Sequence, residues 1–192
     1  GRLGIDPGAS VVVYDDVSGQ IAARMWWMLR SIGHQRVRLL DGGYQAWVAQ
    51  GKEIAVGTVP PPPARYPVPN GYRGVVTRDQ LAGRTVIDAR APERYRGEFE
   101  PVDPKAGHIP EAINIPSGRN LGDDGRFLDA TRLEEVYAGM PSDVVVSCGS
   151  GVTACHDALA LVLARHEMPD VYVGSFSEWS TLDLPVATGP NP

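Results

Sequence analysis

The segment from Val144 to Arg165 constrains the fold of this chain more than any other. It reads VVVSCGSGVTACHDALALVLAR, which is a run of β-branched apolar residues, then a loop of small residues, then apolar residues at helical spacing. This pattern is typical of a buried strand, a tight loop and a helix in direct succession. The segment therefore predicts an α/β fold in which a loop leads from the end of a strand into a helix.

Cys148 is expected where this strand ends, with the backbone N–H groups from Gly149 to Thr153 around its sulfur. The thiolate is the reactive form of cysteine, and the unsatisfied amides of a helix N-terminus stabilise it. Glycines at 149 and 151 let the loop turn tightly and bring its amides close to one atom. A buried structural cysteine is the alternative, since unpaired cysteines are often buried. The glycine-rich loop favours a nucleophile in an anion-binding site.

Spacing excludes other anion-binding loops. A tyrosine-phosphatase loop needs an arginine six residues after its cysteine to bind phosphate bidentately, and Ala154 occupies that position. The segment also lacks the Gly-Lys-Ser/Thr sequence of nucleotide-binding loops and the Gly-x-Ser-x-Gly sequence of hydrolases. The cysteine itself therefore remains the candidate for the chemistry.

Length and charge limit the other possibilities. The 192 residues suffice for one large domain or two small ones. A net charge of −5 provides no basic surface, so no nucleic-acid partner is expected. The longest apolar run is far short of the ~20 residues that span a bilayer, and no signal peptide precedes the first strand, so we expect a cytoplasmic protein without a membrane partner. The scattered histidines show no metal-ligand spacing, so no metal is expected.

An internal repeat indicates two similar modules. Val11–Asp15 aligns with Val144–Cys148, and Gly42–Trp47 aligns with Gly174–Trp179, at offsets that differ by one residue. Each module is predicted to contain a strand, a helix, a second strand and a short helix, which implies a parallel sheet with covered faces. Since Asp15 stands where the second module has its cysteine, the first module is predicted to be a non-catalytic twin.

A proline-rich stretch divides the chain. Residues 57–73 include four consecutive prolines and are predicted to form an extended linker. Residues 1–56 are then the C-terminal half of the non-catalytic domain, and residues 74–192 are the catalytic domain. Seventy residues, 74–143, precede the central strand of the second module, but only ten precede that of the first. We therefore expect a missing N-terminal half of the first domain as a partner, because half a sheet would expose its apolar face.

Local patterns predict the remaining elements. The expected strands are 37–40, 85–89, 113–115 and 171–173. The expected helices are 21–32, one through Tyr44 and Trp47, one starting at Thr77, one at 131–137 and a last turn through Trp179. A hairpin turn is expected at 122–125.

The loop from Cys148 to Ala154, Cys-Gly-Ser-Gly-Val-Thr-Ala, resembles the active loop of the rhodanese superfamily, specifically its 3-mercaptopyruvate sulfurtransferase branch. Other segments resemble family landmarks in family order: Asp41–Gly43 with Trp47, Asp88–Arg90, Gly107–Pro110 with Ala112–Asn114, and Gly174–Trp179. The resemblance implies tandem rhodanese-like α/β domains, each with a central, mostly parallel sheet flanked by helices. It also implies a cysteine that accepts sulfur as a persulfide and passes it to cyanide or to a thiol such as thioredoxin or glutathione, with no cofactor.

The loop composition favours one sulfur donor. The thiosulfate-using branch resembles Cys-Arg-Lys-Gly-Val-Thr, with cations for a dianionic substrate, whereas this chain has neutral Gly149 and Ser150. The resemblance therefore favours 3-mercaptopyruvate over thiosulfate as the donor. A thiosulfate sulfurtransferase, and a non-catalytic module that binds proteins or carries sulfur, remain the alternatives.

Arginines are expected to bind the substrate. Arg90 follows the predicted strand 85–89, and binding groups gather at the carboxyl ends of parallel strands. Its planar guanidinium suits the carboxylate and ketone of mercaptopyruvate. Arg90 resembles the family's substrate arginine and Arg94 a second one, although surface ion pairs with glutamates are the alternative. The resemblance implies that Ser150 bonds the substrate carbonyl or relays a proton. The loop amides of four residues complete the expected site: Gly149, Gly151, Val152 and Thr153.

Overall fold

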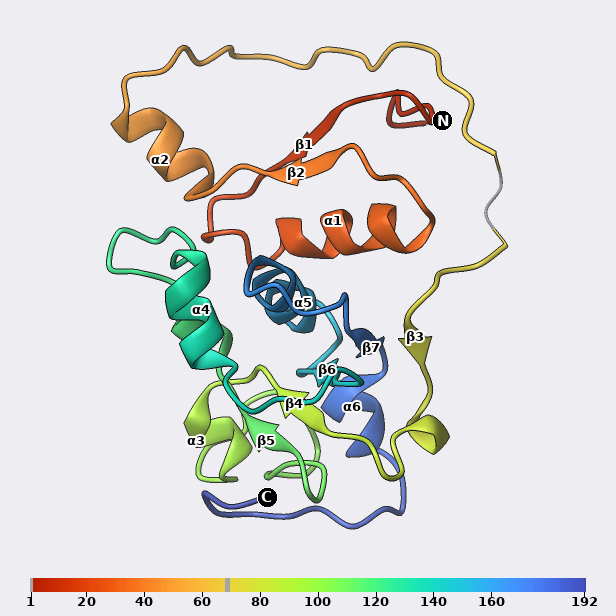
Figure 1. Cartoon of the computed structure of the whole chain (residues 1–192), viewed down its shortest axis with the longest axis vertical. Coiled ribbons are helices and arrows are strands. Elements are labelled where there is room, and N and C mark those ends of the chain that lie inside the picture. Colours follow the sequence, from red (N-terminus) through yellow and green to blue (C-terminus); the bar gives the residue numbers. More distant parts are fainter. Residues whose placement is uncertain (1, 68–69) are drawn as a thin grey trace.

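The computed structural model describes residues 2–67 and 70–192, so two residues of the predicted 57–73 linker, 68 and 69, lie outside it. Strands alternate with short helices along the chain (Figure 1). Before the linker the elements are β1 (Val11–Val13), α1 (Ala22–Ser31), β2 (Val37–Leu39) and α2 (Gly43–Ala49). After it they are β3 (Val75–Val76), η1 (Arg78–Gln80), β4 (Val86–Asp88), α3 (Pro92–Tyr95), β5 (Ile113–Asn114), η2 (Ser117–Asn120), α4 (Ala130–Val136), β6 (Val145–Ser147), α5 (Ala154–Leu163), β7 (Asp170–Tyr172) and α6 (Ser175–Trp179).

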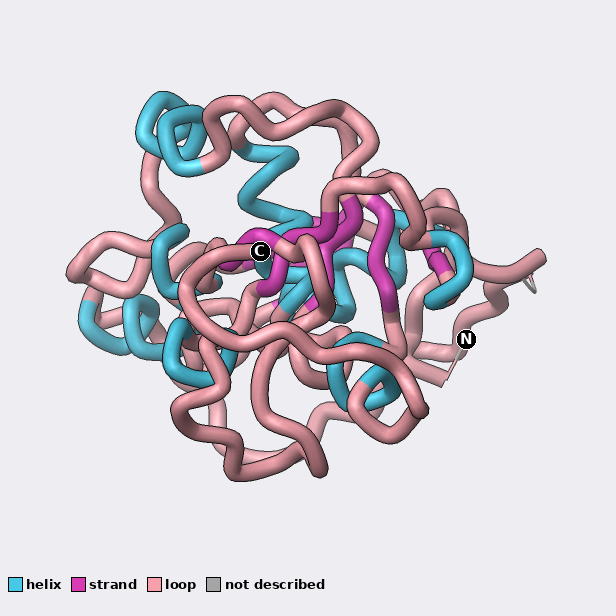
Figure 2. Tube along the Cα trace, turned by 90° about the horizontal axis from the view of Figure 1, so that it is seen from below, coloured by secondary structure: helices cyan, strands magenta, loops and turns pink. Residues whose placement is uncertain are grey.

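The strands form two parallel sheets. β1 pairs with β2, and a five-stranded sheet has the order β3-β7-β6-β4-β5. Figure 2 shows the strands in the middle of the molecule with helices and loops around them. Near-continuous apolar strands such as β6 are expected in a parallel sheet that is buried on both faces. The predicted α/β fold, with a parallel sheet flanked by helices, is confirmed.

One hydrophobic core joins the two predicted modules. Helices α1 and α5 pack against each other between the small sheet and the large one (Figure 1). The fully buried Trp27 of α1 and Cys155 of α5 belong to the same cluster of core side chains. A second cluster, which includes Tyr172 and Phe176, covers the opposite face of the large sheet. The helix of the first module therefore lies beside the helix that follows the cysteine loop.

The two modules make equivalent backbone hydrogen bonds at the ends of their aligned strands, β1 and β6. Tyr44 N–H donates to the Asp15 carbonyl at 2.8 Å, and Phe176 N–H donates to the Cys148 carbonyl at 3.0 Å. Both bonds join a strand end to the start of the short helix that closes the module. These equivalent bonds agree with the aligned segments of the sequence, while the boundaries at 56 and 74 and the missing N-terminal half stay predictions.

Two local features differ from expectation. The helix predicted to start at Thr77 has the capping box with Gln80, but it makes only one 3-10 turn, which ends at Gln80. The short elements α3 and η2 were not predicted. No helix within the described residues has the length and hydropathy that crossing a membrane would require.

Candidate active site

Cys148 lies directly after β6, and α5 begins six residues later. Its side chain is only 2% exposed, and its backbone N–H donates to the Ser175 hydroxyl at 3.1 Å. The loop between β6 and α5 turns at Gly151, whose φ is +70°. A Cβ atom at Gly151 would lie 2.6 Å from the Val173 carbonyl oxygen, so both the backbone conformation and the space require glycine here.

The backbone N–H groups of the loop after Cys148 make no hydrogen bonds to the described protein. Within the described residues, no hydrogen-bond acceptor faces the N–H groups of Gly149, Ser150, Gly151, Val152 and Thr153. Because successive backbone N–H groups can bind an anion together, a loop with this many free donors is suited to hold one. The helix dipole of α5 adds favourable potential at the same place. The structure places this loop directly after Cys148, while the binding of an anion by its amides stays a prediction.

The equivalent loop of the first module is already filled. The Asp15 carboxylate accepts hydrogen bonds from the backbone N–H groups of Val17 at 3.0 Å, Gly19 at 2.8 Å, Ile21 at 2.8 Å and Ala22 at 2.7 Å. Burial raises the pKa of Asp15, but these four hydrogen bonds outweigh it and hold the pKa below its ordinary value. The first module thus holds its own carboxylate where the second module leaves its amides open to an external anion.

A cavity of about 570 Å³ opens at Cys148. Its lining comes from the residues after β4, β5 and β6, together with Gln20 from the first module. The site residues Arg90, Arg94, Cys148 and Ser150 all line this cavity, so the structure brings the predicted groups together. The carboxyl ends of neighbouring parallel strands meet at one edge of the sheet, which explains the convergence.

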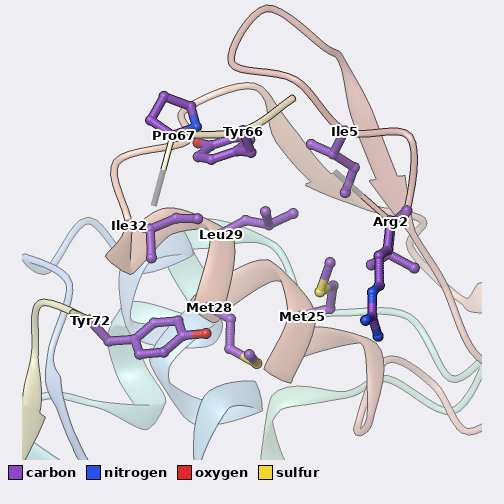
Figure 3. A pocket seen from close by; sticks show the side chains of 10 residues that line it. Arg2, Ile5, Met25, Met28, Leu29, Ile32, Tyr66, Pro67 and Tyr72 are labelled. Carbon is purple, nitrogen blue, oxygen red and sulfur yellow. The ribbon is translucent and has the colours of Figure 1, made fainter. Parts of the chain in front are cut away.

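A second cavity, of about 410 Å³, lies between α1, the N-terminal segment and the linker (Figure 3). Met25, Met28 and Leu29 of α1 face Tyr66 and other mostly apolar side chains. Its described lining residues include no cysteine, histidine or carboxylate. The candidate nucleophile and the predicted polar site residues therefore line the cavity at Cys148.

The guanidinium of Arg90 is committed to the protein itself. Arg90 is 4% exposed, and its Nε and Nη2 donate to the Asp88 carboxylate at 2.7–3.1 Å. Nη2 also donates to the Gly107 carbonyl at 2.7 Å, and Nη1 donates to Glu100 at 3.3 Å. The Phe176 ring lies 3.9 Å from the guanidinium carbon. Most donors of Arg90 are therefore used in holding the β4 end and the 107 turn in place.

Arg94 has a free donor beside the loop. Its Nε and Nη2 pair with Glu100 and Asp103, while Nη1 has no partner in the described ranges. Burial lowers the pKa of Arg94, but its hydrogen bond and charge pairing with Glu100 outweigh this and raise the pKa. A Cβ atom at Gly149 would lie 3.6 Å from Nη1, which places this nitrogen next to the cysteine loop. Arg94 thus offers the cavity one guanidinium nitrogen, Nη1, that is free to donate.

Ser150 and Cys155 have contrasting environments. Ser150 is exposed at the cavity, and its hydroxyl has no hydrogen-bond partner among the described residues. Cys155 is fully buried, its Sγ lies 3.4 Å from the Gly151 carbonyl, and burial raises the pKa of its thiol to about 12. Cys155 is therefore a core residue whose thiol stays protonated.

The sequence did not identify a buried polar network behind the loop. Asn120 donates to Asp157 at 2.8 Å and lies 3.2 Å from His156, and it accepts from Tyr137 at 2.8 Å. Burial raises the pKa of Asp157 well above its ordinary value and lowers that of His156 to about 4. Arg24 of the first module also reaches the loop, where it donates to the Gly151 carbonyl. The sequence at 154–157 does not indicate these contacts, because their partners come from distant segments: η2, the end of α4 and, for the Gly151 carbonyl, α1.

A cysteine at the end of a parallel strand, followed by a loop whose amides have no acceptor among the described residues, defines an α/β protein with a candidate thiol nucleophile. The rhodanese-like domain family matches residues 2–50 and 76–182. A relative from Pseudomonas aeruginosa, named "Probable 3-mercaptopyruvate sulfurtransferase", is 44% identical over 97% of this chain and 70% of its own length. The human 3-mercaptopyruvate sulfurtransferase is 37% identical, over 93% of this chain and 65% of its own. The rat thiosulfate sulfurtransferase is 34% identical over the same shares.

A solved structure agrees with these sequences. The 3-mercaptopyruvate sulfurtransferase from Leishmania major matches with a TM-score of 0.82 and 30% identity, over 96% of this chain and 54% of that one. The chain therefore belongs to the rhodanese-like domain family, as its sequence predicted. It spans 65–70% of the length of the three curated relatives and about half of the Leishmania chain.

Proposed function

We propose that this chain is a sulfurtransferase that moves a sulfur atom from 3-mercaptopyruvate through a persulfide on Cys148 to a thiol or cyanide. The observation that carries this proposal is the contrast between two equivalent loops. In the first module the amides bind the Asp15 carboxylate, whereas around Cys148 they have no acceptor in the described chain. Backbone amides that have no acceptor in the described protein can stabilise a sulfur anion that forms during the reaction.

The first half-reaction loads sulfur on the enzyme. The Cys148 thiolate attacks the sulfur of 3-mercaptopyruvate, an S–S bond forms, and the C–S bond breaks. The electron pair of that bond goes to the substrate carbon as the enolate of pyruvate, which takes up a proton and leaves as pyruvate. The thiol proton of the substrate balances this uptake, so the persulfide remains as an anion. The N–H groups of Gly149, Gly151, Val152 and Thr153 stabilise it without reorganisation.

The second half-reaction returns the enzyme to its starting state. The acceptor thiol gives its proton to the persulfide anion, and the resulting thiolate attacks the outer sulfur. The S–S bond to Cys148 breaks, and the Cys148 thiolate leaves. The acceptor departs as a persulfide, so atoms and electrons balance without a cofactor. We propose a thiol such as thioredoxin or glutathione for this step, with cyanide as an artificial acceptor.

The polar groups of the cavity suit a small keto acid. The free Nη1 of Arg94 lies beside Gly149 and can bind the substrate carboxylate. The unpartnered Ser150 hydroxyl can bond the keto oxygen or pass a proton to the enolate. Arg90 remains in the proposed site as the residue that fixes the cavity wall, with Nη1 as its least engaged nitrogen. The loop itself supplies no cation, which favours a monoanionic donor over the dianion thiosulfate.

The same contrast supports the predicted domain organisation. We propose that residues 1–56 belong to a non-catalytic rhodanese-like unit, that 57–73 form the linker, and that 74–192 form the catalytic unit. The Asp15 carboxylate occupies the first loop, so that loop is closed to a donor. Catalysis then belongs to the second unit alone.

Donor kinetics test the proposed function. Pyruvate release from 3-mercaptopyruvate with a thiol acceptor is compared with thiocyanate release from thiosulfate and cyanide, and the variant Cys148→Ser serves as the control. We expect a kcat/KM at least about tenfold higher for 3-mercaptopyruvate, since a single lost or added charge contact at a desolvated site is worth this much, and no turnover in the variant. A higher kcat/KM for thiosulfate would reassign the donor. If neither donor is turned over, the chain is a non-catalytic module and the proposal is wrong.

A further inference from the structure

Arg24 links the first module to the tip of the cysteine loop. It is the third residue of α1, and its Nη1 donates to the Gly151 carbonyl oxygen at 2.6 Å across 127 positions of the sequence. The same carbonyl oxygen lies 3.4 Å from the buried Cys155 sulfur. A Cβ atom at Gly151 would lie 3.1 Å from the guanidinium, so the contact is tight. The loop tip is thus held from α1 and α5 together.

The position of this carbonyl fixes an amide of the loop. A trans peptide is planar, and its C=O and N–H groups point in opposite directions. When Arg24 holds the Gly151 carbonyl on the α1 side, the N–H group of Val152 in the same peptide plane must point away from α1. That N–H is one of the loop donors without an acceptor among the described residues. A charged donor on the carbonyl also polarises the peptide and strengthens its N–H as a donor.

The other half of the molecule makes the reciprocal contact. His156 is the third residue of α5, and its Nε2 lies 3.3 Å from the Ser18 carbonyl in the loop around Asp15. Each helix therefore places its third side chain on a carbonyl of the other module's loop. The chemistry differs, because burial lowers the pKa of His156 to about 4 and keeps it neutral, whereas arginine is always charged. The permanently charged Arg24 therefore contacts the Cys148 loop, whereas the neutral His156 contacts the Asp15 loop.

We infer that Arg24 is a positioning residue for catalysis, through which the non-catalytic module orients the amides of the Cys148 loop toward the reacting sulfur. The inference rests on the proposed function and extends it to a residue outside the catalytic unit. Arg24 acts through the Gly151 peptide and is not itself in the lining of the Cys148 cavity. The charged residues in that lining are Arg90, Glu93 and Arg94.

Two substitutions at Arg24 and a matched one on the same helix test this role. Arg24→Gln removes the positive charge and shortens the side chain that carries the donor. Arg24→Lys keeps the positive charge and a donor group. Arg30→Gln makes the same chemical change six residues further along α1, at a side chain without a hydrogen-bond partner in the described residues. The readouts are the rate of sulfur uptake in a single turnover with 3-mercaptopyruvate, the pH profile of Cys148 alkylation by iodoacetamide, and the Tm.

We expect Arg24→Gln to slow sulfur uptake by about 10- to 100-fold, the usual effect of a misplaced or missing anion donor, and to move the alkylation profile to higher pH. Arg24→Lys should recover most of both, and Arg30→Gln should match the wild type. An alkylation profile in Arg24→Gln that coincides with those of Arg30→Gln and the wild type would overturn the inference, even if its Tm were lower. If the wild type takes up no sulfur, the proposed function fails, and the alkylation profiles alone decide the role of Arg24.

Discussion

Asp15→Asn probes the filled loop of the first module. The two carboxylate oxygens share four backbone donors: Oδ1 accepts from Val17 and Gly19, and Oδ2 accepts from Ile21 and Ala22. Asparagine has the same shape, but it keeps one acceptor oxygen and turns an NH₂ group toward the other two N–H groups. Two charge-assisted hydrogen bonds are therefore lost and replaced by donors that face donors.

The expected cost follows from these two bonds. A hydrogen bond to a charged group contributes about 1.5–3 kcal/mol, and the partly exposed site reduces this value. We expect Asp15→Asn to lower the free energy of unfolding by about 2–3 kcal/mol. For a chain of this size, that corresponds to a fall in Tm of about 4–10 °C.

The effect must also depend on pH. The four hydrogen bonds outweigh burial and hold the folded-state pKa of Asp15 below its ordinary value of 3.8. A carboxyl group with a lowered pKa stabilises the fold fully above its ordinary pKa and loses that contribution as the pH falls through its folded pKa. The difference between wild type and Asp15→Asn should be constant from about pH 5 to 8 and shrink below about pH 4.

Denaturant unfolding at several pH values measures this difference. Asp16→Asn is the matched control, because Asp16 is the exposed neighbour and its carboxylate has no hydrogen bond to the described residues. It should change the free energy of unfolding by less than about 0.5 kcal/mol. Equal stabilities of the two variants, or a loss in Asp15→Asn that persists unchanged at pH 3, would refute the role given to the carboxylate.

Two further substitutions separate the roles of the loop and of the nearby arginines. Gly151→Ala should slow sulfur uptake at least about tenfold and lower the free energy of unfolding by about 2 kcal/mol. The reason is that the new Cβ would lie 2.6 Å from the Val173 carbonyl oxygen, in a left-handed backbone conformation. Single-turnover and unfolding measurements check the two values. Arg90→Ala should lower the free energy of unfolding by about 3–5 kcal/mol, because it leaves the buried Asp88 carboxylate without its partner. The solvent-exposed ion pair of Arg96 supplies the comparison, and Arg96→Ala should lower stability far less than Arg90→Ala does. Equal losses would contradict the structural role of Arg90.

Local sequence patterns were sufficient for the strand, loop and helix around Cys148. The β-branched run at 144–146 and the apolar spacing after Ala154 are properties of adjacent residues, and β6 and α5 lie where they predict. The glycines at 149 and 151 likewise record a local backbone requirement. The family resemblance depended on the same short-range motifs.

The roles of Arg90 and Arg24 depend on contacts between distant segments, which the sequence patterns do not reveal. Arg90 has the residue type and position of a substrate ligand, but the fold brings Glu100 and the Gly107 carbonyl to its guanidinium beside Asp88. Neither partner is near enough in sequence to reveal this contact by spacing. Arg24 lies 127 positions from Gly151, and the only sequence signal for it is that it holds the same helical position as His156 in the repeat. Short elements such as α3, with four residues, leave no periodicity to read.

Intact-protein mass spectrometry tests the central claim most directly, which is that Cys148 carries the transferred sulfur. The wild type and Cys148→Ser are exposed briefly to 3-mercaptopyruvate, and cyanide is added afterwards. The account predicts that the wild type gains the mass of one sulfur atom, that cyanide removes it, and that the variant never gains it. Uptake of sulfur by Cys148→Ser, or a wild type whose mass does not change, would contradict the account.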